Sequence, residues 1–388
     1  MSNEMNVLFC HPGAELYGSD RMALLTITAL VESGHSVTVV VPSDGPLVPM
    51  LQSVTSDVLI KRIAVTRKSY FSPVGLVKLA LLQFASFIRA LLILKKSNAD
   101  LVFVNTIIQP IWLPAAKIMG RRTICHIRES ENGSSKIVRT ALVAPLVCAD
   151  QIICNSESTR DFVSENISCL SSKTQTIYNG KNWDPYYKSD YKHPTAGPTK
   201  VVLVGRISPR KGQDIAIRAA GWLASRGIAI QLIFAGDVFD GYDWFRQELD
   251  DLAVESRLAF EPLYLGFVAD VADVLERSHI AIVPSRQEPF GTVAAESMAA
   301  MRPTIVSDME GLAEIVDDGV NGAKFPSEDW QALGMCIEKM VTDRLHAESI
   351  ARNGYEHVRS TFSLGNYKSL IQSAVSTGGL ARTKMNRK

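Results

Sequence analysis

Two glutamates stand eight residues apart in the C-terminal half, within the run from Pro284 to Ala300. Glu288 lies in a loop that follows the apolar segment Ile280–Val283, and Glu296 lies in the helical segment after this loop. Each carboxylate can accept hydrogen bonds from two vicinal hydroxyls of a sugar. Two solvated surface carboxylates would give the same spacing. The pair therefore indicates a polyhydroxyl ligand only if neighbouring residues supply the rest of a site.

Two cations follow an earlier strand candidate of the same half. Arg206 and Lys211 come after Lys200–Val204, on a loop that also holds Gly205 and Pro209. Open α/β sheets bind anions at the carboxyl ends of their strands and at nearby helix N-termini, so these cations predict a diphosphate site. A surface arginine and a lysine that flanks a helix are the alternative interpretation.

No residue pattern in the sequence indicates a metal or another cofactor. Asp-x-Asp does not occur, and the six cysteines form no Cys-x-x-Cys or His/Cys cluster with metal-ligand spacing. A dinucleotide fingerprint is also missing, since no Gly-x-Gly-x-x-Gly follows the strand Asn6–Cys10 or the strand that ends at Val204. The sequence therefore predicts that two cations balance the diphosphate without a metal, and it disfavours an oxidoreductase.

The elements that must position these residues alternate between strand and helix along both halves. With 388 residues, of which 46% are hydrophobic, the chain suits two α/β domains. Strand candidates rich in β-branched residues predict two doubly wound, Rossmann-like sheets that are buried on both faces. They are Asn6–Cys10, Val37–Val41, Leu101–Val104, Thr123–Cys125 and Gln151–Cys154 in the first half, and Lys200–Val204, Ala229–Ala235, Ile280–Val283 and Pro303–Val306 in the second.

Turn residues and composition predict where the domains begin and end. We expect an N-terminal domain over 1–180, a linker over 181–199 that contains three prolines, and a C-terminal domain over 200–362. A helix over 363–378 is expected to return to the N-terminal domain, and residues 379–388 to form a basic tail.

Charge is distributed unevenly along the chain, although the net charge is only +1. Residues 60–140 contain fourteen Lys or Arg and three acids, which leaves the rest of the chain acidic. This pattern makes nucleic acid an unsuitable partner and predicts that the first half faces phosphates or an anionic membrane surface; a solvated surface is the alternative. The apolar stretch 73–96 contains Lys78 and Arg89, so we expect a helix packed on the protein or lying on a membrane, and not one that spans it.

The start of the chain shows no charged segment followed by an apolar one, and the cysteines lie mostly in apolar runs. We therefore expect a cytoplasmic protein with reduced thiols. Attachment to the cytoplasmic face of a membrane is an open alternative.

The run around Glu288 and Glu296 resembles the E-x7-E signature of the family 4 retaining glycosyltransferases, also called glycosyltransferase group 1, which have the GT-B fold. Gly205-Arg206 with Lys211-Gly212, and the segment from Asp308 to Gly322, resemble further motifs of that family. The resemblance implies two Rossmann-like domains that face each other across a cleft, with the nucleotide-sugar donor bound by the second domain and the acceptor by the first.

The resemblance also implies roles for individual residues. Gly205, Arg206 and Lys211 would bind the donor diphosphate, and Glu296 the ribose hydroxyls. Glu288 would hold the transferred sugar, helped by backbone N–H groups. Other residues that the resemblance assigns are Phe290, Gly291 and Thr292 for those N–H groups, Gly266 and Phe267 for the nucleobase, Gly18 for a turn near the phosphates, His126 for a contact with the transferred sugar, and Arg128 and Glu129 for acceptor contacts.

Two positions depart from the family pattern. Met301 stands where the family commonly has glycine before an Arg-Pro turn, and Glu310 replaces the first glycine of a Gly-Gly pair. Gly18 is also a single glycine where the family often has two. These departures leave the local loop geometry to be decided by the structure.

Together, the residues and the resemblance predict a retaining, metal-independent glycosyltransferase that moves a hexose from a UDP- or GDP-sugar to a saccharide. The basic, apolar first half favours a lipid-linked acceptor in cell-surface polysaccharide or lipopolysaccharide synthesis; a soluble acceptor is the alternative. A nucleotide-sugar epimerase of the same fold, and a catalytically silent subunit that binds a membrane or a partner, are the competing hypotheses.

Overall fold

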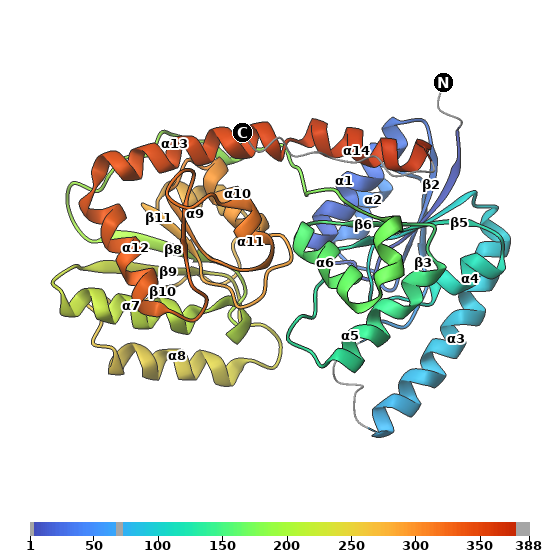
Figure 1. The fold of residues 1–388 in the computed structure, drawn as a ribbon, viewed down its shortest axis with the longest axis horizontal. Coiled ribbons are helices and arrows are strands. Elements are labelled where there is room, and N and C mark those ends of the chain that lie inside the picture. Colours follow the sequence, from blue (N-terminus) through green and yellow to red (C-terminus); the bar gives the residue numbers. More distant parts are fainter. Residues whose placement is uncertain (1–3, 67–72, 378–388) are drawn as a thin grey trace. The chain divides into compact units, whose positions relative to one another are not determined.

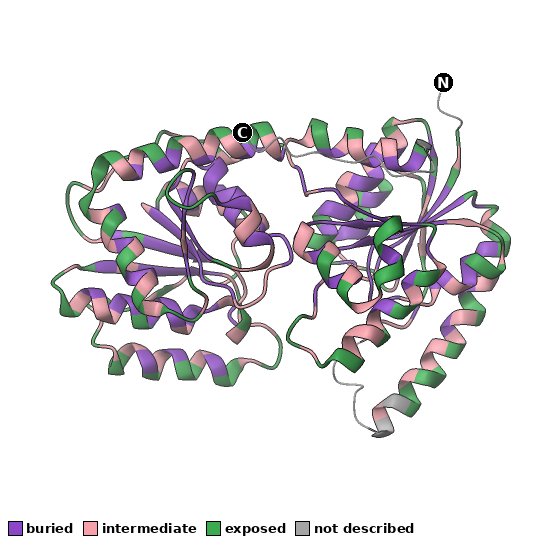
Figure 2. Ribbon diagram, viewed as in Figure 1, coloured by how far each residue is buried: buried purple, intermediate pink, exposed green. Residues whose placement is uncertain are grey.

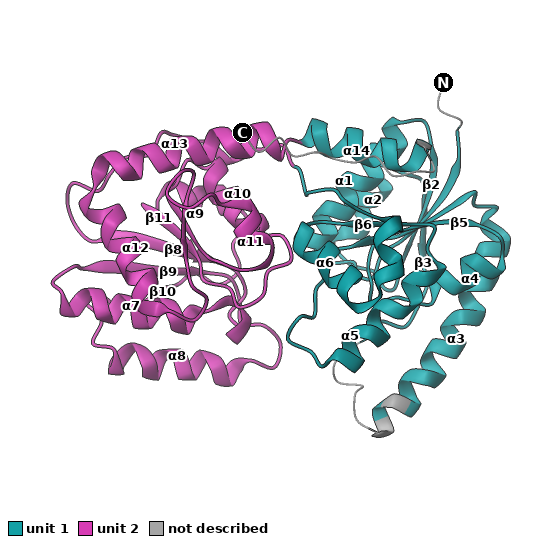
Figure 3. Ribbon diagram, viewed as in Figure 1, with its two compact units in different colours: residues 1–180, 364–388 teal, residues 181–363 magenta. Residues whose placement is uncertain are grey.

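The computed structural model describes residues 4–66 and 73–377, and the chain forms two compact units (Figure 3). Unit 1 contains the chain up to Gly180 and again from Leu364, whereas unit 2 is Lys181–Ser363. The basic tail that the sequence predicts over 379–388 lies outside the described residues.

Unit 1 is built on a seven-stranded parallel sheet in the order β3-β2-β1-β4-β5-β6-β7. Helices connect successive strands, as parallel pairing requires (Figure 1). The elements are β1 Asn6–Cys10, α1 Gly18–Glu32, β2 Ser36–Val41, α2 Leu47–Gln52, β3 Asp57–Ile60, α3 Pro73–Ser97, β4 Leu101–Val104, α4 Trp112–Ile118, β5 Arg122–Ile127, α5 Lys136–Val143, η2 Ala144–Cys148, β6 Gln151–Cys154, α6 Glu157–Asn166, η3 Ser168–Lys173, β7 Thr174–Thr176 and α14 Leu364–Thr377.

Side chains of this sheet alternate between two separate apolar cores, one on each face. Leu8 and Cys10 of β1 pack into one core, and Val7 and Phe9 of the same strand pack into the other. Figure 2 shows the strands buried along most of their length. Because both faces are covered, the strands inside the sheet, β2, β1, β4, β5 and β6, are mostly apolar, which is why the sequence predicts them well.

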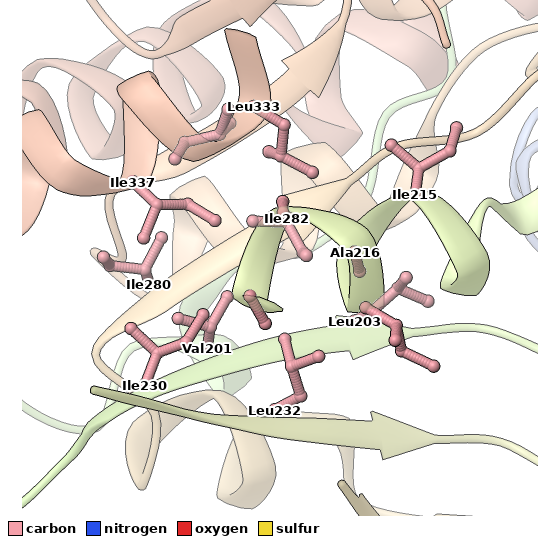
Figure 4. Packing of buried hydrophobic residues seen from close by; sticks show 14 of the residues in the cluster. Val201, Leu203, Ile215, Ala216, Ile230, Leu232, Ile280, Ile282, Leu333 and Ile337 are labelled. Atoms are coloured by element: carbon pink, nitrogen blue, oxygen red, sulfur yellow. The ribbon is translucent and has the colours of Figure 1, made fainter. Parts of the chain in front are cut away.

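Unit 2 is built on a six-stranded parallel sheet in the order β10-β9-β8-β11-β12-β13. One face packs under α7 and α12, where Val201, Leu203 and Ile282 meet Ile215 and Leu333 (Figure 4). The elements are η4 Asp184–Tyr186, β8 Thr199–Val204, η5 Pro209–Lys211, α7 Gln213–Ser225, β9 Ile230–Ala235, α8 Asp243–Glu255, β10 Leu263–Tyr264, α9 Val271–Glu276, β11 Ile280–Val283, α10 Thr292–Ala299, β12 Thr304–Ser307, α11 Glu310–Ile315, β13 Ala323–Phe325, α12 Trp330–Thr342 and α13 Arg344–Thr361.

The nine strands that the sequence predicts are present within one or two residues, but four further strands were not predicted. These four, β3, β7, β10 and β13, are two to four residues long, and each lies at an edge of its sheet. Short edge strands bury few apolar side chains, so their sequences lack the signal of central strands.

The segment 181–199 is not the linker that the sequence predicts, because it belongs to unit 2. Trp183 is 3% exposed, and its indole N–H donates to the carbonyl of Phe362 at 2.7 Å. Tyr191 is also buried, in the apolar core of this unit. The prolines and polar residues of the segment outweigh these aromatic rings in a composition-based prediction, although the rings determine where it packs.

Helix α14 is fastened into unit 1 by a buried hydroxyl. The Tyr367 hydroxyl lies 2.6 Å from Oγ1 of Thr26 on α1, and it accepts a hydrogen bond from Nη2 of Arg128 at 2.9 Å. Arg122 adds two bonds, from Nη1 to the carbonyl of Val375 and from Nη2 to the carbonyl of Ala374. The last helix therefore completes a core that begins at β1.

We predict that Tyr367→Phe destabilises the protein by about 1–3 kcal/mol, because the arginine and threonine each lose a buried partner. The measurement is urea denaturation monitored by circular dichroism. Tyr187→Phe is the matched control, since the Tyr187 hydroxyl donates to Asp190 at the surface, and it is expected to change stability by no more than about 0.5 kcal/mol. Equal effects of the two substitutions would contradict the structural role of the Tyr367 hydroxyl.

Candidate functional site

The carboxyl ends of β8 and β11 lie side by side at the centre of the sheet of unit 2. The chain proceeds from β8 to β9 on one side and from β11 to β12 on the other, so the strand order reverses between them. Open α/β sheets bind ligands at such a reversal, beyond the carboxyl ends of the strands. Loops 205–212 and 284–291 follow these two strands and contain most of the predicted donor-site residues.

Lys211 and Glu288 form an ion pair between these two loops. The ammonium nitrogen lies 2.6 Å from Oε2 of Glu288, and the two side chains are 22% and 17% exposed. Gly205 at the end of β8 lies against the aliphatic part of Lys211: a Cβ at this position would lie 3.5 Å from its Cδ and Cε atoms. The structure thus brings together the cation and the carboxylate that the sequence assigns to one donor.

The ionisation of Glu288 is controlled by competing effects. Burial opposes the charged form, but the positive charges of Lys211 and Arg210 and the hydrogen bond from Lys211 outweigh it, so the pKa of Glu288 is lowered. Glu288 is therefore a carboxylate at neutral pH, able to accept hydrogen bonds.

Arg286 fastens the two loops to each other, a role that the sequence does not predict. Its guanidinium donates to both carboxylate oxygens of Asp214, at 2.8 and 2.7 Å, and to the carbonyl of Pro209 at 2.6 Å. Glu328 pairs with it from the other side. Hydrogen bonds to Asp214 raise the pKa of Arg286 against the opposing effect of burial. A bidentate pair of this kind fixes direction as well as distance, so it sets the position of the lysine loop.

Glu310, the first residue of α11, supports Glu288. Its Oε2 accepts a hydrogen bond from the backbone N–H of Glu288 at 2.6 Å, and the next residue, Gly311, donates its N–H to the carbonyl of Glu288 at 3.1 Å. Glu310 and Met301, the two departures from the family pattern, have φ of 43° and 54°. Glycine adopts this left-handed conformation without strain, so both positions retain the backbone geometry at some energetic cost.

Glu296 lies on α10 and is held by two residues of the segment that was predicted to be a linker. Its Oε1 accepts hydrogen bonds from Nζ of Lys181 at 2.6 Å and from the hydroxyl of Tyr186 at 2.7 Å. The Glu296 and Lys181 side chains are 11% and 13% exposed. A largely buried carboxylate requires such partners.

Helix α10 begins at Thr292, so the backbone around Phe290, Gly291 and Thr292 presents the positive end of this helix. Phe290 is buried and packs edge-on against Phe362, with ring centroids 5.6 Å apart. Gly291 has φ of 104°, and a Cβ there would lie 2.5 Å from Leu312. Glycine is therefore required at position 291, because any side chain there would clash with Leu312.

Arg206 stacks on an aromatic ring, with its guanidinium carbon 4.0 Å from the ring centroid of Phe239. Gly266 and Phe267 follow β10, on the same carboxyl edge of the sheet. The Phe267 N–H donates to Asp237 at 2.9 Å, and Phe267 is 65% exposed. The proposed contacts of Arg206 with phosphate and of Phe267 with a base stay predictions.

In unit 1, His126 lies inside a strand, whereas the sequence predicts that it follows one. It is the fifth residue of β5, which extends to Ile127, and it is fully buried. Burial and the nearby charge of Arg128 lower the pKa of His126 well below its usual value, so the ring is neutral. The contact with the transferred sugar that the resemblance implies stays a prediction. The prediction placed the end of the strand at Cys125, two residues too early.

Arg128 is likewise buried and does not face an acceptor. Its guanidinium donates to Oδ1 of Asn105 at 3.0 Å and to Oδ1 of Asn179 at 2.7 Å, besides Tyr367. Glu129 is half-buried and accepts hydrogen bonds from Thr106 at 2.7 Å and from the backbone of Ile107 at 3.3 Å. Arg128 is therefore a structural residue in this conformation. The predicted acceptor contact of Glu129 has no support from these bonds.

Gly18 is the exposed first residue of α1. A Cβ at Gly18 would have no neighbour within 4 Å, so packing does not require glycine there. Asp20 accepts a hydrogen bond from the N–H of Tyr17 at 3.0 Å, and this bond stabilises the start of the helix. The predicted proximity of Gly18 to phosphates stays a prediction.

Two family models match the chain in succession. The model of glycosyl transferases group 1 matches residues 189–357, and that of glycosyltransferase family 4 matches residues 17–182. The chain belongs to the group 1 glycosyltransferases. The match over 189–357 contains the Lys211–Glu288 pair and Glu296.

Solved structures show the fold of this group 1 glycosyltransferase. It resembles Anabaena Alr3699/HepE in complex with UDP and glucose, with a TM-score of 0.80 and 23% identity over 96% of this chain and 100% of that one. It also resembles sucrose-phosphate synthase from Thermosynechococcus elongatus, with a TM-score of 0.74 and 18% identity over 95% and 98% of the two chains. The fold is GT-B, as the motif resemblance implies.

Curated relatives of this glycosyltransferase are matched over about half of their length. Glycogen synthase of Mycobacterium tuberculosis is 29% identical over 55% of this chain and 51% of its own length. Glycosyltransferase MJ1607 of Methanocaldococcus jannaschii is 29% identical over 56% and 57%. The lipopolysaccharide core mannosyltransferase LpcC of Rhizobium leguminosarum is 29% identical over 43% and 47%.

Sequence reasoning on this glycosyltransferase missed Lys181, Tyr186 and Arg286. Arg286 lies inside the motif run before Glu288, so its position was a usable signal. Lys181 and Tyr186 gave no local signal, because their partner Glu296 lies more than a hundred residues away along the chain.

We predict that Lys211→Met lowers stability by about 1–3 kcal/mol at neutral pH, because Glu288 keeps its buried charge but loses its partner. The lowered pKa of Glu288 means that the ion pair stabilises the protein fully above the usual carboxyl pKa, and that this contribution is lost as the pH falls through the lowered value. The difference from wild type should therefore shrink at acidic pH.

Urea denaturation at several pH values from neutral down to about pH 3, which is below the usual carboxyl pKa, is the measurement. Lys324→Met is the control, since its partner Asp308 is 51% exposed and solvent weakens such pairs. A difference between wild type and Lys211→Met that stays constant with pH would contradict the assigned role of Glu288.

Proposed function

We propose that this protein is a retaining glycosyltransferase that transfers a hexose from a UDP- or GDP-sugar to a saccharide acceptor. The observation that best supports this proposal is the Lys211–Glu288 pair at the strand-order reversal of unit 2, with Arg206 on the same loop as the lysine. The diphosphate and the sugar of a nucleotide-sugar are directly bonded to each other. A lysine that binds the diphosphate and a carboxylate that binds the sugar must therefore lie close together, as Lys211 and Glu288 do. HepE, a structural relative, is described in complex with UDP and glucose.

In the proposed reaction, Arg206, Lys211 and the N-terminus of α10 stabilise the diphosphate as it leaves. The bond between the sugar carbon C1 and the phosphate oxygen breaks, and the acceptor oxygen bonds to C1 on the same face. The departing phosphate oxygen accepts the proton of the acceptor hydroxyl, so no protein base is needed. Glu288 holds the hydroxyls of the transferred sugar, and it is not proposed as a nucleophile.

The proposed reaction uses no metal or cofactor, since Arg206 and Lys211 neutralise the leaving group. Within residues 4–66 and 73–377, no group of three or more His, Cys, Asp or Glu side chains could hold a metal ion. Metal independence stays a proposal, and activity in the presence of EDTA is its direct test.

Helix α3 supports a lipid-linked acceptor. Val77, Leu81, Phe84, Ile88 and Leu92 recur at helical spacing along one face and are 44–68% exposed. Lys78, Arg89, Lys95 and Lys96 are exposed on the same helix, and α3 contains no acidic residue. An apolar face beside several cations suits the surface of an anionic bilayer.

By length and composition, the part of this helix over Val77–Ser97 could cross a membrane, with a mean hydropathy of 1.9. Ala90, Ile93 and Leu94 are nevertheless buried in a core of unit 1. Crossing the bilayer would remove these contacts, so we propose that the helix lies on the membrane surface, where a lipid-linked saccharide is presented. LpcC, named as a lipopolysaccharide core mannosyltransferase, is a relative consistent with such an acceptor.

We predict that one UDP- or GDP-sugar of a panel raises the melting temperature, because a ligand at a hundred times its Kd stabilises the native state by about 2.7 kcal/mol. With that donor, Arg206→Met should lower kcat/KM by about a hundredfold or more. Arg226→Met is the matched control, since this arginine also stacks on a ring, Trp222, at 4.7 Å but lies outside the site. A change below about twofold for Arg206→Met would refute its assignment to the diphosphate.

We predict that the double variant Leu81→Ser/Phe84→Ser reduces binding to vesicles of phosphatidylglycerol and phosphatidylethanolamine by about tenfold or more, since each side chain contributes about 1.5–3 kcal/mol when buried. Vesicle co-sedimentation is the measurement. Val254→Ser/Leu345→Ser removes two exposed apolar side chains from unit 2 and should leave binding unchanged. Equal binding by both double variants would exclude α3 as the contact surface.

A further inference from the structure

Lys181, Tyr186 and Glu296 form a closed triangle of hydrogen bonds in unit 2. Nζ of Lys181 lies 2.6 Å from Oε1 of Glu296 and 2.7 Å from the Tyr186 hydroxyl, which in turn lies 2.7 Å from the same Oε1. Both protein bonds therefore fall on one oxygen of the carboxylate. Among the described residues, Oε2 has no hydrogen-bond partner.

The two residues that support Glu296 are themselves held in place. The ammonium of Lys181 lies over the ring of Tyr186, 4.8 Å from its centroid, and over that of Trp183 at 5.7 Å. Trp183 is anchored by its bond to the Phe362 carbonyl, and the backbone N–H of Lys181 donates to this carbonyl at 3.2 Å. Neither side chain is a flexible surface group.

An unsupported glutamate would be poorly suited to recognise hydroxyls at this depth. A carboxylate that is 11% exposed is partly desolvated, and its side chain has rotatable bonds whose freedom must be lost on binding. A cation and a hydroxyl on Oε1 compensate the charge and fix the rotamer before the ligand arrives. The second oxygen then keeps its lone pairs for a ligand.

We propose that Lys181 and Tyr186 are positioning residues that preorganise Glu296 so that its Oε2 accepts hydrogen bonds from the ribose of the nucleotide donor. This inference rests on the proposed function, in which Glu296 binds the ribose. It adds that discrimination between ribose and 2′-deoxyribose depends on two residues at the start of unit 2, more than a hundred residues before Glu296. Lys181 acts on this discrimination through Glu296.

The test compares binding of UDP with 2′-deoxy-UDP, and of GDP with 2′-deoxy-GDP, by isothermal titration calorimetry. We expect the wild type to prefer the ribonucleotide. Lys181→Met should weaken ribonucleotide binding by about tenfold, a change typical of a lost charged hydrogen bond, while 2′-deoxynucleotide binding changes little. Tyr186→Phe, which removes a single hydroxyl, should reduce the preference less, and Lys181→Arg should restore part of it.

Two further variants make the outcome decisive. Glu296→Gln is the reference for loss of ribose recognition, and adding Lys181→Met to it should have no further effect on the preference, because both substitutions remove one interaction. Lys188→Met is the matched control: Lys188 lies in the same segment and pairs with Asp270, which is 63% exposed. It should bind as the wild type does.

If the wild type binds neither nucleotide, or binds the 2′-deoxy form equally well, the proposed role of Glu296 fails. If Glu296→Gln loses the preference but Lys181→Met keeps it, only the present inference is overturned. A uniform loss of affinity for both sugars in Lys181→Met would mean that Lys181 merely supports the fold, and this result also overturns the inference. Should Lys181→Met not fold, Tyr186→Phe gives the same comparison.

Discussion

The site in unit 2 depends on the requirement that partly buried charges be compensated. Lys211 meets Glu288, Lys181 meets Glu296, and Arg286 meets Asp214, each across more than seventy residues of sequence. Taking one charge out of water is costly unless an opposite charge or several dipoles replace the solvent. The loops after β8 and β11 consequently hold each other, and the helix α10 is bound to the segment that begins unit 2.

Compensated charges have a consequence for the proposed donor. A diphosphate that approached Lys211 would compete with Glu288 for the same ammonium group, and a carboxylate released from this pair would have lone pairs for the hydroxyls of the sugar. In the proposed function, one exchange of partners thus serves both ends of the ligand. Lys211 binds the side chain of Glu288, whereas Glu310 and Gly311 bind its backbone. These backbone hydrogen bonds would keep Glu288 in place while its side chain exchanges the ammonium group for the sugar.

In unit 1, the buried guanidinium of Arg128 is compensated in a different way. Arg128 is surrounded by neutral partners, two asparagines and a tyrosine hydroxyl among them, and these partners come from the end of β4, from the last residues before unit 2 and from α14. The arginine therefore joins segments that are distant in sequence. The acceptor side of the proposed reaction has less support than the donor side, because His126 and Arg128 are buried here.

The sequence by itself determined the class of the fold and the central strands, since strands buried on both faces must be apolar throughout. It also made Arg206, Lys211, Glu288 and Glu296 candidates for a donor site, because their positions after strands and their spacing are local properties of the chain. Only the tertiary structure decided their partners. Lys181, Tyr186 and Glu310 meet the site through contacts between distant segments, and the burial of His126 depends on where β5 ends. Local patterns contain no information about such contacts, since a hydrogen bond forms wherever folding brings donor and acceptor together.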